Sequence, residues 1–380
     1  MMEDNYQVKT DEKRLIQIRE ITKTLPQTCG DFIRAISTTT TSLTRLAYAY
    51  DLRIFFQFLQ QESAKFSAIT HLYEVTDQMI DEITQRDLEE FVEYLTIYFP
   101  QLSSSDQPVT NNELGIMRKI STLRSFFGYL FRSKRIKSNV ATLISLPKIH
   151  EKPILRLELD EIEKMLSVIE TGDQLTDRQR AYQERTRVRD YAIISLFLGT
   201  GIRVSECVGI NISDIDFEQN AFLVTRKGGN QVILYFPEEV SDALYAYYEE
   251  RIQIEALPGH ENAFFLSLQK RRITQRAVQN LVKKYASIAA PLKKKISPHK
   301  LRSTFGTNLY NETGDIYLVA DVLGHADVNT TRKHYAAMTQ ARRKEAVKYV
   351  KYRNEVDSNH SNNDSSPTVS NKSNKNEEQK

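Results

Sequence analysis

The segment from Leu146 to Pro153 limits how this chain can fold, because it separates two stretches of helical pattern. It reads Leu-Pro-Lys-Ile-His-Glu-Lys-Pro, with a proline near each end and mostly polar residues between them. Proline removes a backbone donor and disfavours helix at the preceding residue. We therefore expect an extended linker at residues 146–157, with a separately folded region on each side.

Residues 41–145 have the pattern of a small helical domain. Ser42 caps an amphipathic segment that continues to Gln61. One stripe of this segment carries Leu46, Tyr50, Ile54 and Phe58. Residues 1–40 before it are polar and read as a partly helical leader.

Two more helices complete the predicted domain. One opens at Thr84, with Asp87 at the third helical position as a variant capping box. The other covers residues 111–131, where basic residues alternate with Phe126, Phe127 and other aromatic residues. We expect these aromatic residues to belong to a core rather than to a base-stacking platform.

The second half of the chain combines helices with one β-hairpin. Strand patterns at residues 221–225 and 232–236 flank Gly228-Gly229-Asn230, a sequence typical of a turn. Residues 351–380 are rich in Asn, Ser and Lys and lack periodicity, which predicts a disordered tail. The predicted helices are 158–170, 188–198, 238–251, 275–289, 299–311, 316–323 and 339–350.

Composition is that of a soluble globular protein of 380 residues. The sequence has no apolar run of about 18 residues, and its N-terminus lacks the pattern of a signal peptide. Its two cysteines, Cys29 and Cys207, are too few for a disulfide framework and have no metal-ligand spacing. These features predict a cytoplasmic location and no metal.

Charge is segregated along the chain, although the net charge is only +3. From Ser267 to Arg302 there are eleven Lys or Arg and no Asp or Glu, and residues 114–150 are likewise basic without acids. Such blocks make positive surfaces that attract a polyanion. The alternative is that each block is an ordinary solvated helix face.

Several residues have the chemistry needed to cut a phosphodiester without a metal. Arginine binds two phosphate oxygens with its planar fork and stays charged at any working pH. Arg203 follows a Thr-Gly break that ends an apolar helix. Arg302 lies three residues after His299, so both face one side of a helix that Ser297 caps and Pro298 opens.

The order and spacing of these residues form specific motifs. They are Thr200-Gly201-Ile202-Arg203-Val204-Ser205-Glu206, His299-Lys300-Leu301-Arg302-Ser303-Thr304-Phe305, and Leu323-Gly324-His325 followed by Tyr335. With them the sequence resembles the tyrosine recombinases of the phage-integrase and Xer type over about residues 40–350. Cys207 and Ser303 depart from the family pattern, in which Leu and His are usual, and neither is a reacting group.

The resemblance implies a fold and an organisation. The fold would be mainly α, with a small β-sheet or hairpin in the catalytic domain, as a two-domain C-shaped clamp around DNA. The domains would be a leader at 1–40, a helical, SAM-like core-binding domain at 41–145, the linker at 146–157, a catalytic domain at 158–350 and the tail at 351–380.

The resemblance also implies metal- and ATP-independent DNA strand transesterification without a cofactor. Tyr335 would attack the scissile phosphate and form a 3′-phosphotyrosyl link. Arg203 and Arg302 would clamp the non-bridging oxygens. A phenol with a pKa of about 10 is a weak nucleophile and needs nearby positive charge and a base.

Four further residues would assist the reaction. His325 would donate a hydrogen bond to the phosphate, and His299 would assist proton transfer with Tyr335. Lys227 would be the general acid for the leaving 5′-oxygen, although the adjacent Arg226 could be presented by the same turn. We favour Lys227 because burial can lower the pKa of lysine but not that of arginine. Glu206 would support the site.

The expected partner is duplex DNA with an inverted-repeat recombination site. The chain would self-associate as a tetramer on two sites, with a DNA translocase as a possible directing partner and without a membrane. Phosphate contacts should make binding salt-dependent. The candidate DNA-binding residues are Arg118, Lys119, Arg124, Lys134, Arg135, Arg271, Arg272, Arg276, Lys283 and Lys284.

The biological role has alternatives. Xer-type resolution of chromosome dimers is favoured, because the leader lacks the β-alternation of a separate arm-binding domain. The integrase or excisionase of a phage or conjugative transposon is the second hypothesis. A type IB topoisomerase and a non-catalytic DNA-binding protein are hypotheses from outside recombination.

Overall fold

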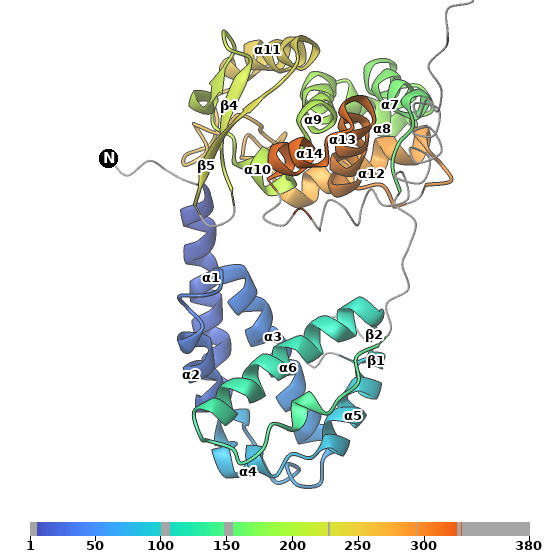
Figure 1. Cartoon of the computed structure of the whole chain (residues 1–380). Coiled ribbons are helices and arrows are strands. Elements are labelled where there is room, and N and C mark those ends of the chain that lie inside the picture. Colours follow the sequence, from blue (N-terminus) through green and yellow to red (C-terminus); the bar gives the residue numbers. More distant parts are fainter. Residues whose placement is uncertain are drawn as a thin grey trace, which may run out of the picture. The chain divides into compact units, whose positions relative to one another are not determined.

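The computed structural model describes residues 6–99, 107–147, 155–226, 229–293 and 295–324, together with residue 328. These residues are mainly helical and include two small antiparallel sheets (Figure 1). The buried hydrophobic residues form two cores, one within residues 18–144 and one within residues 157–301. The predicted mainly helical fold with a small sheet is confirmed, and one core lies on each side of the predicted linker in the sequence.

The first region is built around helix α3 (Ser42–Glu62), which contacts four other helices. Those helices are α1 (Tyr6–Lys23), α2 (Gln27–Ala35), α5 (Gln85–Tyr94) and α6 (Glu113–Arg132). The smaller elements are α4 (Asp77–Asp81), the 3₁₀ turns η1 (Leu72–Glu74) and η2 (Val140–Thr142), and the paired strands β1 (Ile97–Tyr98) and β2 (Val109–Thr110).

Helix α3 buries only part of the predicted stripe. Tyr50 is 38% exposed and Ile54 is only partly buried, whereas Leu46 and Phe58 are in the core. A step of four residues advances about 40° beyond a full helical turn, so a stripe with this spacing winds away from the core. The residues that fill the core at 0–1% exposure are Ala49, Leu52, Phe55, Phe56 and Leu59.

Two local predictions in this region are confirmed. The Thr84 N–H donates to Asp87 Oδ2 at 2.7 Å, and the Asp87 N–H donates to Thr84 Oγ1 at 3.4 Å, which is the reciprocal capping box. Phe126 and Phe127 are fully buried, as expected for core residues.

Residues 6–35, within the predicted leader, are largely helical and pack into the first core. Helices α1 and α2 pack on each other and on α3, and Leu25, Cys29 and Phe32 are buried in the same core. Helix α1 is mostly polar, and only a narrow stripe with Ile18 and Ile21 is buried. That low apolar content conceals the helix from a search for amphipathic patterns.

The second region surrounds helix α9 (Arg187–Thr200), whose residues 192–197 are all buried. A helix that is apolar on all sides belongs in the middle of a domain. It packs against α7 (Leu159–Thr171), α11 (Glu238–Ile252) and α13 (Pro298–Thr313) (Figure 1). The remaining helices are α8 (Asp177–Gln183), α10 (Val204–Gly209), α12 (Gln275–Ala289), α14 (Ile316–Leu323) and the 3₁₀ turn η3 (Ile212–Asp214).

The predicted hairpin is confirmed and belongs to a three-stranded antiparallel sheet. Its strands are β3 (Ile215–Asp216), β4 (Ala221–Thr225) and β5 (Gln231–Tyr235), in the order β3-β4-β5. Phe222 pairs with both Ile215 and Leu234, which fixes the register. Strand β3 is too short to leave a strand pattern in the sequence.

The ends of the predicted linker differ from its middle. Residues 148–154 lie outside the described part of the chain. Leu157 is buried in the second core, and its N–H donates to Thr304 Oγ1 of α13 at 3.0 Å.

The predicted helix at 339–350 and the tail at 351–380 also lie outside the described residues. None of the described helices is long and apolar enough to cross a membrane.

Candidate active site

Gly201 brings three helices together at the start of the first motif. It ends α9 with φ +60°. A Cβ at this position would lie 2.4 Å from the ring of Phe305 and 2.9 Å from the side chain of Leu323. A side chain would therefore push α13 and α14 away from the end of α9, so close approach here requires glycine.

Arg203 is held by the acid three residues later. Its backbone N–H donates to Glu206 Oε2 at 3.0 Å, and its Nη1 donates to Oε1 at 2.8 Å. The Glu206 side chain is 3% exposed, whereas that of Arg203 is 35% exposed. The carboxylate thus fixes the guanidinium from the buried side and leaves part of it accessible.

Arg302 and His299 lie on the first turns of α13, which Pro298 opens after Ser297 as predicted. His299 is exposed and Arg302 is only 6% exposed. Arg302 Nη1 donates to the Gly201 carbonyl at 2.5 Å, and Nη2 donates to the Leu323 carbonyl. These hydrogen bonds to the motifs that contain Gly201 and Leu323 fix the orientation of the guanidinium from its buried side.

The C-terminal end of α14 gathers three arginines. Its last carbonyls have no partner within the helix, and its dipole places partial negative charge there. Arg203 Nη2 donates to the Gly324 carbonyl at 2.9 Å, and Arg302 donates to that of Leu323. Arg226, which follows β4, donates from Nη2 to the Val322 carbonyl at 3.0 Å. These arginines lie 121, 96 and 21 residues from their acceptors in the sequence, and they are joined at one helix end.

This grouping keeps its positive charge. Main-chain carbonyls accept hydrogen bonds without neutralising a guanidinium, and Glu206 is the carboxylate paired with Arg203. Three guanidinium groups held by main-chain carbonyls produce a local positive potential, the electrostatic condition for binding a phosphate.

The remaining residues of the predicted set are not placed by the structure. Lys227, His325 and Tyr335 lie outside the described residues. In sequence, Lys227 follows Arg226 and His325 follows Gly324, so the described part of the site ends beside two of them.

Cys207 is a core residue, as expected. It is fully buried, and burial raises the pKa of its thiol, with a further contribution from the Glu206 charge. A thiol held in the protonated form is a poor nucleophile, which fits its structural role.

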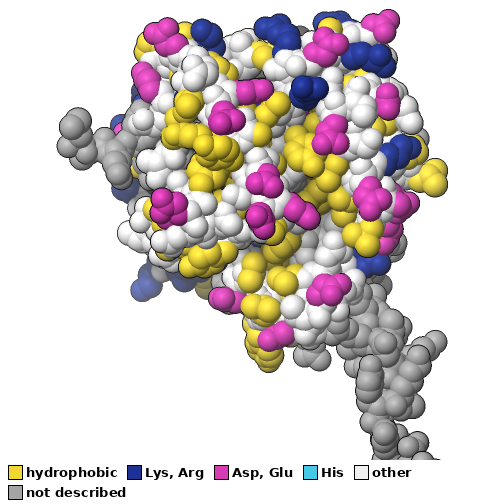
Figure 2. Space-filling view, turned by 90° about the horizontal axis from the view of Figure 1, so that it is seen from above, with side chains coloured by type: hydrophobic (Ala, Val, Ile, Leu, Met, Phe, Trp, Pro, Cys, Tyr) yellow, Lys and Arg dark blue, Asp and Glu magenta, His cyan; other side chains and the backbone are white. Residues whose placement is uncertain are grey.

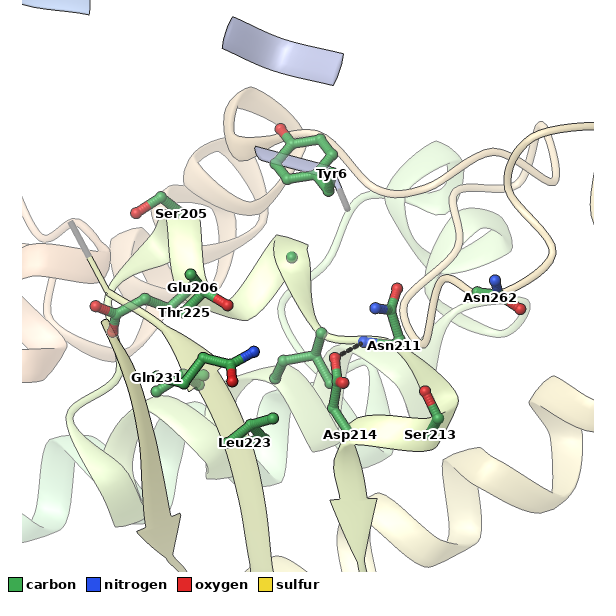
Figure 3. A pocket seen from close by; sticks show the side chains of 13 residues that line it. Tyr6, Ser205, Glu206, Asn211, Ser213, Asp214, Leu223, Thr225, Gln231 and Asn262 are labelled. Carbon is green, nitrogen blue, oxygen red and sulfur yellow. Dashed lines mark hydrogen bonds between the residues drawn. The ribbon is translucent and has the colours of Figure 1, made fainter. Parts of the chain in front are cut away.

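A polar cavity of about 360 Å³ lies next to the clustered arginines and shares Glu206 with the site. Figure 3 shows Glu206, Thr225 and Gln231 along one part of its wall, and Asn211 with Asp214 along another. The Asn211 N–H donates to Asp214 Oδ2 at 2.7 Å. None of the three clustered arginines lines the cavity, and the described residues include no group of three or more His, Cys, Asp or Glu placed to hold a metal.

Six of the ten candidate DNA-binding residues are engaged with protein groups. Three of them donate to main-chain carbonyls or pair with acids near the surface: Arg124 with the Ile144 carbonyl, Arg135 with Asp31, and Arg272 with the Val208 and Ile210 carbonyls. The other three belong to buried networks: Arg118 with Asp51, Lys119 with Asn111, and Lys284 with Asp190.

The other four candidates, Lys134, Arg271, Arg276 and Lys283, are exposed. They are the members of the set best able to reach a phosphate. Figure 2 shows a different kind of face on the second region, with acidic and hydrophobic side chains across its middle and Lys and Arg mainly toward its edges. Helix α11, at the top of Figure 1, carries the acids Glu238, Glu239, Asp242, Glu249 and Glu250.

Comparisons with known proteins match this geometry. Residues 156–342 match the phage integrase family. The chain is 35% identical over 305 residues to the tyrosine recombinase XerC of Caldanaerobacter subterraneus subsp. tengcongensis, covering 79% of each chain. It is 29% identical over 315 residues to the tyrosine recombinase XerS of Lactococcus lactis subsp. cremoris, covering 76% of this chain and 87% of that one.

A solved structure has the same fold. The Tn1549 transposon integrase, in complex with transposon right end DNA, matches with a TM-score of 0.59 at 22% identity, covering 85% of this chain and 99% of the integrase. The chain belongs to the phage integrase family of tyrosine recombinases. It is therefore an enzyme of site-specific recombination that cuts and rejoins DNA strands, and its relatives favour the Xer type.

Proposed function

We propose that Arg203 and Arg302 bind the scissile phosphate and that Tyr335 is the nucleophile. The observation that carries this proposal is the convergence of arginines at the end of α14, one residue before His325 in sequence. Both guanidiniums are oriented in advance by fixed acceptors, so little reorganisation is needed as negative charge develops on the phosphate.

The cutting step transfers the scissile phosphoryl group from the 5′-oxygen of the DNA to the phenol oxygen of Tyr335. The Tyr335 phenol oxygen forms a bond to phosphorus and loses its proton with the help of His299. The bond from phosphorus to the 5′-oxygen breaks, and Lys227 gives that oxygen a proton. His325 and the two arginines stabilise the charge on the non-bridging oxygens. Rejoining reverses these steps, so the bond energy is kept and neither ATP nor a metal is required.

The biological role in this proposal is Xer-type resolution of chromosome dimers in the cytoplasm. One observation supports it over the integrase of a mobile element. The relatives described above are XerC and XerS. Four subunits would act on two inverted-repeat sites, with a DNA translocase as the candidate directing partner.

The chemistry is tested with a nicked suicide substrate in EDTA. Wild-type protein should form a covalent protein–DNA adduct that denaturing gel electrophoresis detects. Tyr335→Phe should form none while its DNA affinity stays within about twofold, since only the hydroxyl is removed. The variant His334→Gln, changed at the neighbouring residue, is the matched control and should still form the adduct. An adduct in Tyr335→Phe would move the nucleophile elsewhere.

The biological role is tested by deleting the gene. Loss of dimer resolution should produce filamentous cells with unsegregated chromosomes. A plasmid carrying an inverted-repeat site from the same chromosome should recombine only with the enzyme present. Recombination confined to the ends of a mobile element would overturn the role. Relaxation of supercoiled plasmids that lack any such repeat would favour the topoisomerase hypothesis.

A further inference from the structure

Arg226 ties two parts of the second region together. Its main chain closes the turn between β4 and β5, because its N–H donates to the Asn230 carbonyl at 2.7 Å and its carbonyl accepts from the Gly229 N–H at 3.1 Å. Its side chain leaves the hairpin and donates to the Val322 carbonyl of α14 at 3.0 Å. One residue therefore links the hairpin turn to the helix end that also binds Arg203 and Arg302.

Gly324 makes room for this link. A Cβ built on Gly324 would lie 2.0 Å from Nη1 of Arg226 and 2.3 Å from Cζ. The guanidinium thus lies directly against the main chain at the end of α14, and any side chain at position 324 would displace it. The positive φ of +60° at Gly324 independently favours glycine.

The link is not explained by stability alone. The Nε atom of Arg226 is buried without a hydrogen-bond partner among the described residues. Leaving a donor unpaired in the interior is unfavourable, and such groups in native structures call for a structural or functional reason. An apolar residue would fill the same space without that cost, but it would not attach the turn to the α14 carbonyls.

The reason lies in the next residue. In the proposed function, on which this inference rests, Lys227 protonates the departing 5′-oxygen. A general acid acts only within hydrogen-bond reach of the atom that takes its proton. Without the Arg226 side chain, the β4–β5 turn would be fixed by its strand ends alone. An error of about 1 Å in the position of a catalytic group costs about 100-fold in rate. We propose that Arg226 is a positioning residue, which holds the β4–β5 turn on the end of α14 so that the general acid meets the leaving oxygen.

The leaving group provides a selective test. In a suicide substrate with sulfur in place of the bridging 5′-oxygen, the bond from phosphorus to sulfur breaks and the thiolate leaves without needing a proton. A defect in proton donation disappears on this substrate, whereas a defect in phosphate binding or in the nucleophile remains. Single-turnover cleavage of both substrates is measured with the full chain at saturating protein.

Arg226→Ala should cleave the ordinary substrate about 100-fold more slowly, within the range of general-acid contributions. On the sulfur substrate it should be within about threefold of wild type. Arg226→Lys, which keeps the charge but not the planar fork, should show a smaller loss with the same rescue. Arg178→Ala, at an exposed arginine of α8, is the matched control and should cleave both substrates normally.

Arg226→Ala or Arg226→Lys with equal defects on the two substrates, or with no defect, would overturn the inference. Circular dichroism at the assay temperature checks that each variant is folded, and Arg226→Lys provides the comparison if Arg226→Ala is not. Lys227→Ala separates the two proposals. If its own defect is not rescued by sulfur, the proposed role of Lys227 fails, whatever Arg226 does.

Discussion

The two regions of this chain hold their arginines in different ways. In the first region, Arg118 forms two hydrogen bonds of 2.6 and 2.7 Å to the carboxylate of Asp51, a side chain that is 1% exposed. In the second region, Arg226 and Arg302 instead donate to main-chain carbonyls around the end of α14. The first arrangement neutralises the cation. The second fixes its direction and leaves its charge.

That difference determines what each arginine can do. A carboxylate partner stabilises a fold and weakens the attraction of the guanidinium for a phosphate. A carbonyl partner orients the guanidinium at little cost to its charge, so an anion can still be bound. The second region also uses the first arrangement, because buried Asp190 accepts from Arg189 at 2.7 Å and from the Tyr285 hydroxyl at 3.0 Å. Arg203 at the site combines the two arrangements, because it pairs with Glu206 and also donates to the Gly324 carbonyl. The arrangement therefore depends on the partners of each arginine rather than on its domain.

The sharpest test of the carbonyl-held group is Arg302. Arg302→Ala should lower the rate of single-turnover cleavage by about 10³-fold, the upper range for loss of one donor to a developing oxyanion. It should also destabilise the fold by about 1–3 kcal/mol, because the buried carbonyls of Gly201 and Leu323 lose their donor. Cleavage of a suicide substrate and thermal unfolding measure the two effects.

Arg302→Lys separates charge from geometry. Lysine keeps the cation but cannot make two parallel bonds, so cleavage should still fall by about 10²-fold. If Arg302→Ala loses stability while cleavage falls less than about tenfold, Arg302 is structural and the proposed difference between the two regions fails.

Asp51 tests the carboxylate-held arrangement. Asp51→Ala removes the acceptor of Arg118 and of the Thr122 hydroxyl at 2.8 Å. Breaking a buried pair costs about 3–5 kcal/mol, and the lower end applies because the Arg118 side chain is half exposed. Hydrogen exchange of α3 and α6 in the full chain should report a loss of local stability of about 3 kcal/mol.

A surface pair is the control for Asp51. Glu90 accepts from the exposed Arg86 at 2.8 Å, and Glu90→Ala should leave the free energy of unfolding unchanged within experimental error. Unchanged exchange in Asp51→Ala, together with tighter DNA binding through a released Arg118, would contradict the view that Asp51 serves the fold.

Much of the fold follows from the sequence because its signals are local. The bounds of α12 and α14 coincide with the predicted segments, and the Thr84 capping box is present. The short helices α8 and α10 were not predicted, since one or two turns give no usable periodicity. The burial of helix α1 has little signal in the sequence, because it depends on packing against α3 rather than on the composition of α1 itself.

The site was predictable only in part. The order of the motifs predicts Arg203 and Arg302 as site residues. The spacing of three residues from Arg203 to Glu206 is compatible with the contact that the structure shows. The role of Arg226 at the end of α14 has no sequence signal, because its acceptor is a carbonyl that every residue has. A charge block likewise does not reveal which cations meet a buried acid 67 residues away, as Arg118 does.

The smallest effect separates two neighbours on α12. Lys283 is exposed, whereas Lys284 Nζ lies 3.7 Å from the buried carboxylate of Asp190 and 3.9 Å from the centre of the Tyr285 ring. Lys283→Gln should weaken DNA binding severalfold and reduce the slope of log K against log salt by about 0.9, with an unchanged melting temperature. Lys284→Gln should lower the melting temperature and leave the salt slope unchanged. Titration of a labelled duplex at several salt concentrations measures the slope for both variants. If Lys284→Gln instead reduced the salt slope and Lys283→Gln lowered the melting temperature, the pairing with Asp190 would leave Lys284 available to DNA. The contact between Lys284 and a buried carboxylate would then not explain which of the two lysines binds a phosphate.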